Sequence, residues 1–470
     1  MQLSMNNMQL SMNVVNANGL TDIERVQLAE LVNVLNAHTV QNAKKCRYYE
    51  GHISLREVNL GLALPDSIRD LEIGCSWGEK AVDVLAARSM FDGFVGENGE
   101  ESYLMAQIAK DNRLNAEYIK ACRDELKYGC SFATLSADDA IGCKIRFHSP
   151  RTAAALWNGE KCRIDCGMAI IDTVKDESDK SWTPHIINLY TDDAVVVLRY
   201  DGKMWNAEHF YHTMGRPLME PLAWNATSDK PFGRSRLKEP IRRLIQGYVR
   251  TVANATIGLE FSTSPQKYLL GVSDDQYDAV VDNKFRAYVG SIIASTNNPD
   301  TGEKPSFGQL PQGTIEPHVQ MMRLLATQFS AASGLTVTDV GVINDANPTS
   351  SDAILAQSQT LVLMAEQLNA ANADALYTIS QMAQAIALNV NIEDLDETQR
   401  NIVAHFKNPA MPSVSVTADA AIKIASARPN FAATDVFAEM IGFSQADIRR
   451  IRGQESRARG LAVLDEVEME

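Results

Sequence analysis

The chain has 470 residues, of which 45% are hydrophobic and 22% are charged, and its formal net charge at pH 7 is −15. A chain of this size can bury a sizeable core and form about two to four domains. The acidic balance argues against a general nucleic-acid binder, which is usually basic, but is compatible with a protein that surrounds DNA without gripping it. No apolar run approaches the roughly 18 residues of a membrane span, and we expect neither a membrane span nor a secretory signal.

The first elements are a tail and a long helix. Residues 1–20, in which the pentapeptide MQLSM occurs twice, are predicted to be a disordered tail. Residues 21–48 are predicted to form an amphipathic helix. Thr21 is its expected N-cap, and Glu24 three residues later completes a capping box.

Short helices and then strands follow. We predict helices over residues 81–88 and 115–128, with Gly129 ending the second, and a strand over 94–99 that enters a hairpin turn. Residues 130–225 alternate apolar runs with turn residues, which is typical of a strand-rich block. Seven cysteines are scattered along the chain, and we expect them to be reduced.

The segment 235–261 is predicted to be a helix, and it is the most basic part of this acidic chain. Its cations could contact DNA, or they could form a pairing face that meets carboxylates of a neighbouring protomer. We favour the pairing face. The cations are Arg234, Arg236, Lys238, Arg242, Arg243 and Arg250. Residues 266–315 then change in composition and form a small module between two helices.

The next stretch reads as helix, loop and very long helix. The first helix covers residues 317–333 and is stopped by Gly334. The loop 335–347 has few apolar groups, so we expect it to be mobile. Residues 351–390 contain no Pro or Gly and predict a rod of roughly 60 Å. Such a rod is a poor enzyme core and a good spoke for a large assembly.

The C-terminal part is predicted to be mostly helical. Helices are expected over 394–408, 417–427, 433–440 and 445–453, with an extended stretch at 411–416. The acidic end of the chain is expected to fray.

Residue patterns that would indicate catalysis or metal binding are weak. There is no P-loop, H-E-x-x-H, G-x-S-x-G or G-x-G-x-x-G pattern. His209 and His212 fall in a strand and turn region, where an odd offset sends side chains to opposite faces. Four residues that are near one another in the sequence could form a zinc site, namely Cys143, His148, Cys162 and Cys166. We favour the alternative, in which the cysteines are buried thiols on strands. We predict no active site, no metal and no cofactor.

Five stretches, in order, resemble the portal proteins of tailed phages, the long-tailed ones in particular. Together they fall within roughly residues 20–460. They are Cys46–Leu55 (CRYYEGHISL), Trp77–Phe94, Asp124–Phe132, Pro231–Ile245 (PFGRSRLKEPIRRLI) and Asn347–Ala356 (NPTSSDAILA).

The resemblance implies an α+β portal fold and a non-enzymatic structural role. Portals form a homo-oligomeric ring of about twelve subunits, closed by head-to-tail contacts, at one vertex of the virion capsid. Double-stranded DNA is packaged and ejected through that ring. The implied partners are the large terminase subunit, a head-completion or tail adaptor, and the major capsid and scaffolding proteins, with no membrane. The implied locations are the virion and, during assembly, the host cytoplasm.

The resemblance also implies a division of the chain after the tail. The expected parts are an N-terminal wing over 21–233, stem helices over 234–264 and 316–333, a small α/β clip over 265–315, a tunnel loop over 334–349, a long spoke helix over 350–392 and a C-terminal wing and crown over 393–470.

Three sets of site residues follow from this division. The DNA-facing tunnel loop is Leu335, Thr336, Val337, Thr338, Asp339, Val340, Gly341, Val342, Ile343, Asn344 and Asp345. The stem set is Arg236, Arg242, Arg243 and Arg250. The set expected to dock partners on the clip is Tyr277, Val280, Lys284 and Phe285. The loop holds two aspartates and no Lys or Arg, which suits a channel through which DNA slides.

Two other classes of protein were weighed. One is another ring-forming head–tail protein, such as an adaptor, although adaptors are generally much shorter. The other is an unrecognised hydrolase or nuclease with its carboxylates in residues 130–225, where Asp192, Asp193 and Asp201 also suit turn geometry.

Overall fold

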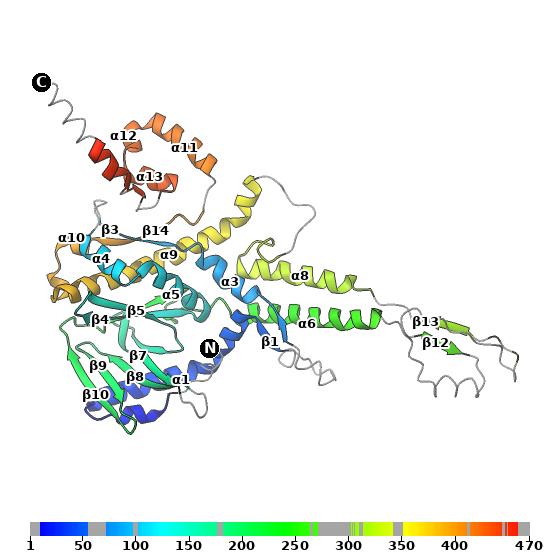
Figure 1. Ribbon diagram of the computed structural model, residues 1–470, viewed down its shortest axis with the longest axis horizontal. Helices are drawn as coiled ribbons and strands as arrows, with labels where there is room; N and C mark the ends of the chain where they lie inside the picture. The colour runs from blue at the N-terminus through cyan, green and yellow to red at the C-terminus, as the bar shows by residue number, and fades with distance from the viewer. Residues whose placement is uncertain are drawn as a thin grey trace. The chain divides into compact units, whose positions relative to one another are not determined.

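The computed structural model describes most of the chain in two compact units. The described residues are 10–54, 72–96, 102–175, 182–263, 267–270, 306–309, 314–341, 351–410, 414–443 and 450–458, with isolated positions at 302, 304, 447 and 448. Unit 1 comprises Met1–Gly51, Ser76–Arg242 and Ser330–Glu470, and unit 2 comprises His52–Cys75 and Arg243–Phe329. Helices and antiparallel sheets are mixed along the chain (Figure 1), which confirms the predicted α+β class.

The N-terminal segment is packed, so the predicted disordered tail is wrong from residue 10 on. The 3-10 helix η2 (Met12–Asn16) precedes helix α1 (Asp22–Glu50). Leu10 and Val14 are buried in the same apolar cluster as Leu28 of α1. The capping box at the start of α1 is present as predicted, because Thr21 and Glu24 bond each other's backbone N–H groups.

A five-stranded antiparallel sheet fills one side of unit 1, in the order β10-β9-β8-β7-β6. The strands are β6 (Ala153–Asn158), β7 (Arg163–Lys175), β8 (Trp182–Tyr190), β9 (Ala194–Tyr200) and β10 (Trp205–Tyr211). Met168, Ile187 and Val196 of this sheet are buried with α1 and η2 in one cluster. These strands confirm the predicted strand-rich block.

A smaller sheet, in the order β11-β4-β5, lies against two helices. The elements are α5 (Leu114–Tyr128), β4 (Cys130–Asp138), β5 (Gly142–His148), β11 (Met219–Ala223) and α9 (Ser351–Leu388). Gly129 ends α5 with a φ of 119°, as the sequence indicated. The long helix α9 packs on all three strands of the small sheet.

The sequence predicted one very long helix from Ser351, and α9 confirms it. This helix runs through the centre of unit 1 (Figure 1). Its side chains at Leu361, Leu368, Leu376, Ile379 and Met382 are all buried. A helix that is apolar on more than one face is typical of a protein core.

Helix α3 (Trp77–Ala86) crosses α1 at close range. A Cβ at Gly78 would overlap the backbone carbonyl oxygen of Tyr48, so only glycine fits this crossing. Helix α4 (Tyr103–Asp111) follows strand β3 (Phe91–Gly96).

Strand β3 pairs with a strand that the sequence did not predict. Its partner is β14 (Ile402–Phe406), in antiparallel register. The predicted helix over 394–408 is therefore wrong: η4 (Ile392–Asp394) and α10 (Glu397–Arg400) are short, and β14 follows them. The predicted turn at residues 98–99 lies outside the described residues.

The chain continues into a helical C-terminal part. Its helices are α11 (Val414–Ala427), α12 (Pro429–Ala432) and α13 (Asp435–Ile441), and residues 450–458 are also helical. Helix α11 covers the predicted span 417–427, and α13 covers residues 435–440 of the predicted span 433–440. The predicted extended stretch is contradicted at Val414, where α11 begins.

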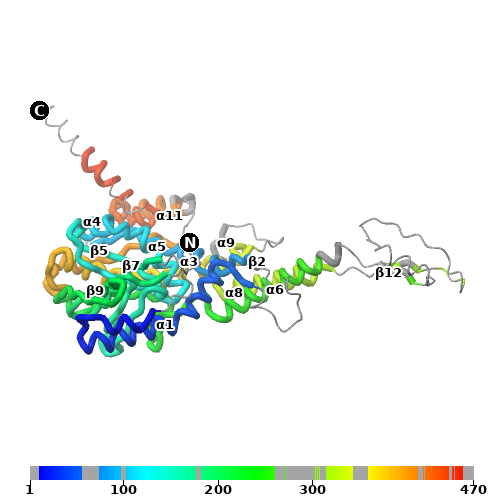
Figure 2. The backbone as a smooth tube through the Cα atoms, turned by 60° about the horizontal axis from the view of Figure 1, so that its bottom comes forward, coloured from blue at the N-terminus to red at the C-terminus, as the bar shows by residue number. Residues whose placement is uncertain are grey.

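Unit 2 is built on two helices that lie side by side (Figures 1 and 2). They are α6 (Glu239–Thr263) and α8 (Glu316–Ser333), and most of each belongs to unit 2. Two short antiparallel ladders accompany them: β1 (His52–Ser54) with β2 (Glu72–Gly74), and β12 (Lys267–Leu270) with β13 (Ser306–Gln309). Across the described residues, no helix is both long and apolar enough to cross a membrane.

Candidate functional site

The predicted channel-facing segment begins directly after α8. Gly334 ends that helix in the left-handed conformation, with a φ of 72°, as predicted. The Ser330 hydroxyl donates a 2.6 Å hydrogen bond to the carbonyl of Leu335. Leu335 and Val340 are both buried, so apolar contacts hold this part of the segment.

A tight turn follows and includes Asp339. The Asp339 carboxylate accepts hydrogen bonds from the Thr336 N–H at 3.0 Å and the Thr336 hydroxyl at 2.7 Å. The Lys80 ammonium group donates to the Asp339 carbonyl at 2.5 Å. Residues 335–341 are thus held by hydrogen bonds and buried apolar side chains, and the Asp339 carboxylate belongs to the turn. Val342, Ile343, Asn344 and Asp345 lie outside the described residues.

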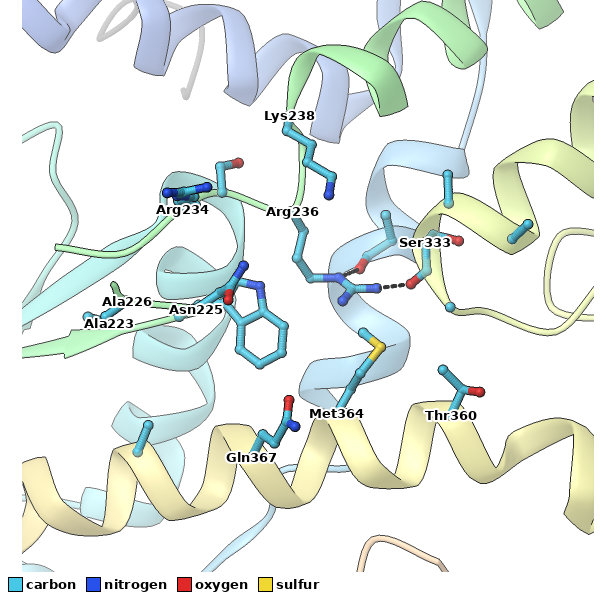
Figure 3. A pocket seen from close by; sticks show the side chains of 17 residues that line it. Ala223, Asn225, Ala226, Arg234, Arg236, Lys238, Ser333, Thr360, Met364 and Gln367 are labelled. Atoms are coloured by element: carbon cyan, nitrogen blue, oxygen red, sulfur yellow. Dashed lines mark hydrogen bonds between the residues drawn. The ribbon is translucent and has the colours of Figure 1, made fainter. Parts of the chain in front are cut away.

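Arg236, predicted to lie on an exposed basic helix, is buried before that helix begins. Its guanidinium donates to the carbonyl of Ala81 in α3 and, at 2.6 Å, to the carbonyl of Ser333 at the end of α8 (Figure 3). The Trp224 ring lies 5.9 Å from the guanidinium carbon. Desolvation lowers the Arg236 pKa to about 10.

Arg236 therefore has a structural role inside unit 1. Its guanidinium satisfies two backbone carbonyls, one of which is among the four that a helix leaves unpaired at its C-terminus. Sequence reasoning started the helix at residue 235, whereas α6 starts at Glu239. Pro240, in the first helical turn, was the available signal for the later start.

The other stem arginines are distributed differently. Arg242 donates at 2.8 Å to the Leu237 carbonyl, and its guanidinium lies 6.0 Å from the Tyr48 ring centre. Arg243 is exposed and Arg250 is half-buried. The last two are seven residues apart and so lie on one side of α6. The four clip residues, Tyr277, Val280, Lys284 and Phe285, lie outside the described residues.

A cavity of about 580 Å³ opens beside Arg236 (Figure 3). Its walls come from the chain before α6, the end of α8, α3, the residues after β11, and α9. Three of the lining residues are cationic, namely Arg234, Arg236 and Lys238, and none is an Asp or Glu. The sequence analysis identified all three cations as part of a basic segment, but it did not predict that they line one cavity.

A buried polar cluster lies elsewhere in the core of unit 1. The Asn372 side-chain amide donates to the Glu125 carboxyl and to the Tyr118 hydroxyl, both at 2.9 Å. The Tyr118 and Ser89 hydroxyls are 2.7 Å apart. Burial raises the Glu125 pKa to about 8. All four side chains are buried, so the cluster belongs to the core, and sequence reasoning did not identify it.

The residues weighed for metal binding or catalysis do not converge. Cys162 is exposed in a turn, whereas Cys143 and Cys166 are buried. His148 bonds the Thr134 hydroxyl, and His209 lies 2.9 Å from a carboxylate oxygen of Glu24. In the part of the chain that the structure describes, no three His, Cys, Asp or Glu residues are arranged to hold a metal ion.

Comparisons with known proteins give only distant similarities. No family model and no curated protein matches the sequence. Among solved structures, a chain from the neck of an empty GTA particle, computed with C6 symmetry, is 12% identical, with a TM-score of 0.45 over 81% of this chain and 90% of that one. A second, from the neck of a native GTA particle computed with C12 symmetry, is 11% identical, with a TM-score of 0.44 over 78% of this chain and 89% of that one.

Proposed function

We propose that the protein is a phage portal subunit. Copies of it close into a ring at a capsid vertex, and double-stranded DNA is packaged and ejected through that ring. The large terminase subunit and a head-completion or tail adaptor dock on the ring, and the role is structural rather than catalytic. The observation that carries the proposal is the two-helix architecture of unit 2.

The α6–α8 pair buries one apolar seam and exposes apolar residues elsewhere. At the seam, a Cβ on Gly247 of α6 would lie 3.2 Å from the Leu325 side chain of α8, so the helices pack closely. Away from the seam, Leu259 is 42% exposed, Met321 44% and Leu324 51%. A helix pair on its own leaves such residues in water, whereas neighbouring copies in a ring would cover them.

The sequence supplies two further supports. The five portal-like stretches occur in order, and residues 334–349 contain no Lys or Arg. A channel lined by that segment would not form strong ion pairs with phosphates, so DNA could slide through it.

Ring formation is tested by native mass spectrometry and negative-stain imaging of the purified chain. We expect closed rings with a central hole. Leu324→Glu is expected to give folded monomers, because it places a charge where a neighbour would pack. Leu324→Met, which keeps an apolar side chain of similar volume at the same position, is the matched control and should form rings. Wild-type protein that stays monomeric at all concentrations and salts would refute the proposal.

The partner surface is tested separately on the clip. A charged substitution at Tyr277 or Val280 is expected to leave rings intact and to block docking of the terminase or the adaptor. Loss of rings with normal partner binding by the monomer would contradict the clip assignment.

The DNA path is tested with Asp345→Lys, which leaves the Asp339 turn untouched. The added cations should slow packaging, and the slowing should weaken as salt rises, because phosphate attraction depends on counterion release. Packaging that is unchanged at both low and high salt would argue against a channel lined by this loop.

A further inference from the structure

The cationic cavity beside Arg236, here called the cationic pocket, has no Asp or Glu among the residues that line it. Arg236 is only 8% exposed, and both partners of its guanidinium are neutral carbonyls. Lys238 is exposed at the rim, opposite Thr360, Met364 and Gln367 of α9 (Figure 3). Arg234 is also exposed and has one surface carboxylate, that of Asp229, at 3.8 Å. A concentration of cations without acids is unusual in a chain whose net charge is −15.

The size of the pocket indicates what could occupy it. A volume of about 580 Å³ is far larger than one small anion needs. Its walls carry several alanines and Met364 besides the cations, so the pocket suits a protein segment that carries carboxylates. A DNA duplex fits it poorly, because cations that hold phosphates would brake the sliding that a channel requires.

A matching acidic segment exists at the other end of α9. The turn between α9 and β14, here called the acidic turn, exposes four carboxylates within five residues: Glu393, Asp394, Asp396 and Glu397. Two of them serve the turn itself, since Asp394 accepts a hydrogen bond from Asn391 and Asp396 caps α10. Within the described residues, the Glu393 and Glu397 carboxylates make no hydrogen bond or ion pair, so they are available for an external contact.

The two surfaces are rigidly separated within unit 1. Gln367 lines the pocket and α9 ends at Leu388, so roughly 30 Å of helix lies between them. A copy therefore cannot place its own acidic turn in its own pocket. Complementary surfaces at two different places on one body are what a head-to-tail contact between successive copies requires.

We infer that the cationic pocket of one copy receives the acidic turn of the next copy around the ring. This inference rests on the proposed ring and identifies one of its subunit contacts. Arg236 would hold the pocket together from inside, while Arg234 and Lys238 would meet the carboxylates at the rim. Because opposite charges meet in only one orientation, the contact would also fix the direction in which copies follow one another.

Charge reversal tests the pairing. The pocket variant is Arg234→Glu/Lys238→Glu, and the turn variant is Glu393→Lys/Glu397→Lys; neither alters Arg236 or the caps of the acidic turn. Each variant alone sets like charges against each other, and we expect its subunit affinity to fall by about a hundredfold or more. An equimolar mixture should restore rings in which the two variants alternate, which native mass spectrometry detects as a 1:1 composition.

Controls separate this inference from the proposed function. Lys203→Glu/Glu208→Lys reverses two exposed charges on the β9–β10 hairpin and should leave rings unchanged. If the wild type forms rings and the pocket variant forms normal rings as well, the inference is overturned, but the proposed ring still stands. A mixture that fails to assemble would overturn it too, as would pocket-variant rings that assemble normally but pass DNA faster. Absence of wild-type rings would instead refute the proposed function.

Discussion

Glu125 makes the stability of unit 1 depend on pH in an unusual direction. The side chain is fully buried, and desolvation raises its pKa from 4.5 to about 8. Between these two values the folded chain holds a proton that the unfolded chain has released. Stability is therefore complete below about pH 4.5, falls as the pH rises, and levels off above about pH 8.

The size of the effect follows from the shift. Between pH 4.5 and about pH 8, each pH unit lowers the free energy of unfolding by about 1.4 kcal/mol, so the full window lowers it by roughly 5 kcal/mol. Glu125→Gln keeps the shape and an oxygen to accept the Asn372 bond, but it cannot ionise. We expect the variant to match wild type within about 1 kcal/mol at pH 5 and to be more stable by several kcal/mol at pH 8.

The assay is urea unfolding followed by tryptophan fluorescence at pH 5, 6.5 and 8, in the Leu324→Glu background so that assembly does not contribute. Asp124 and Glu220 also have raised pKa values, of about 6 and about 7, so the difference between variant and wild type isolates Glu125. Glu117→Gln, on the exposed side of the same helix, is the control, since its ion pair with Lys120 is worth less than about 1 kcal/mol. If the free energies of unfolding of Glu125→Gln and wild type differ by the same amount at pH 5 and at pH 8, Glu125 does not hold a proton in the folded chain.

Three further substitutions probe the anchoring contacts. Gly78→Ala should destabilise unit 1 by at least about 3 kcal/mol in thermal melting, because its methyl group overlaps a carbonyl of α1, whereas Gly159→Ala, which has open space around it, should be neutral. Asp339→Ala should cost about 1 kcal/mol and raise hydrogen exchange at the turn after α8; unchanged exchange would mean that the turn does not depend on this carboxylate. Arg236→Met should cost about 2–3 kcal/mol by leaving the Ser333 carbonyl without its donor, and a neutral result would show that water replaces the guanidinium.

The elements that the sequence predicted correctly depend on neighbours in the chain. The capping box of Thr21 and Glu24 and the glycine at 129 each specify a helix end through residues within one turn. The absence of Pro and Gly from 351 to 388 likewise predicts one long helix. Its burial was not predicted, because that depends on a sheet formed far earlier in the chain.

The errors come from long-range contacts. Strand β14 was predicted to be helical because its partner, β3, lies some three hundred residues away. Arg236 was counted among surface charges because two carbonyls from distant helices, α3 and α8, determine its burial. The cationic pocket could not be foreseen either, since it assembles from five separate stretches of chain.

The discontinuity of unit 1 has a consequence for its synthesis. The small sheet is completed early in synthesis. Helix α9, which covers that sheet, and strand β14, which pairs with β3, emerge from the ribosome only after the whole of unit 2. Between the synthesis of β5 and that of β14, on the order of tens of seconds pass at cellular elongation rates. During that time buried residues such as Leu135 and Ile145 lack their covering helix. Nascent chains halted before residue 351 should therefore be held by chaperones, and chains extended past residue 406 should be released from them.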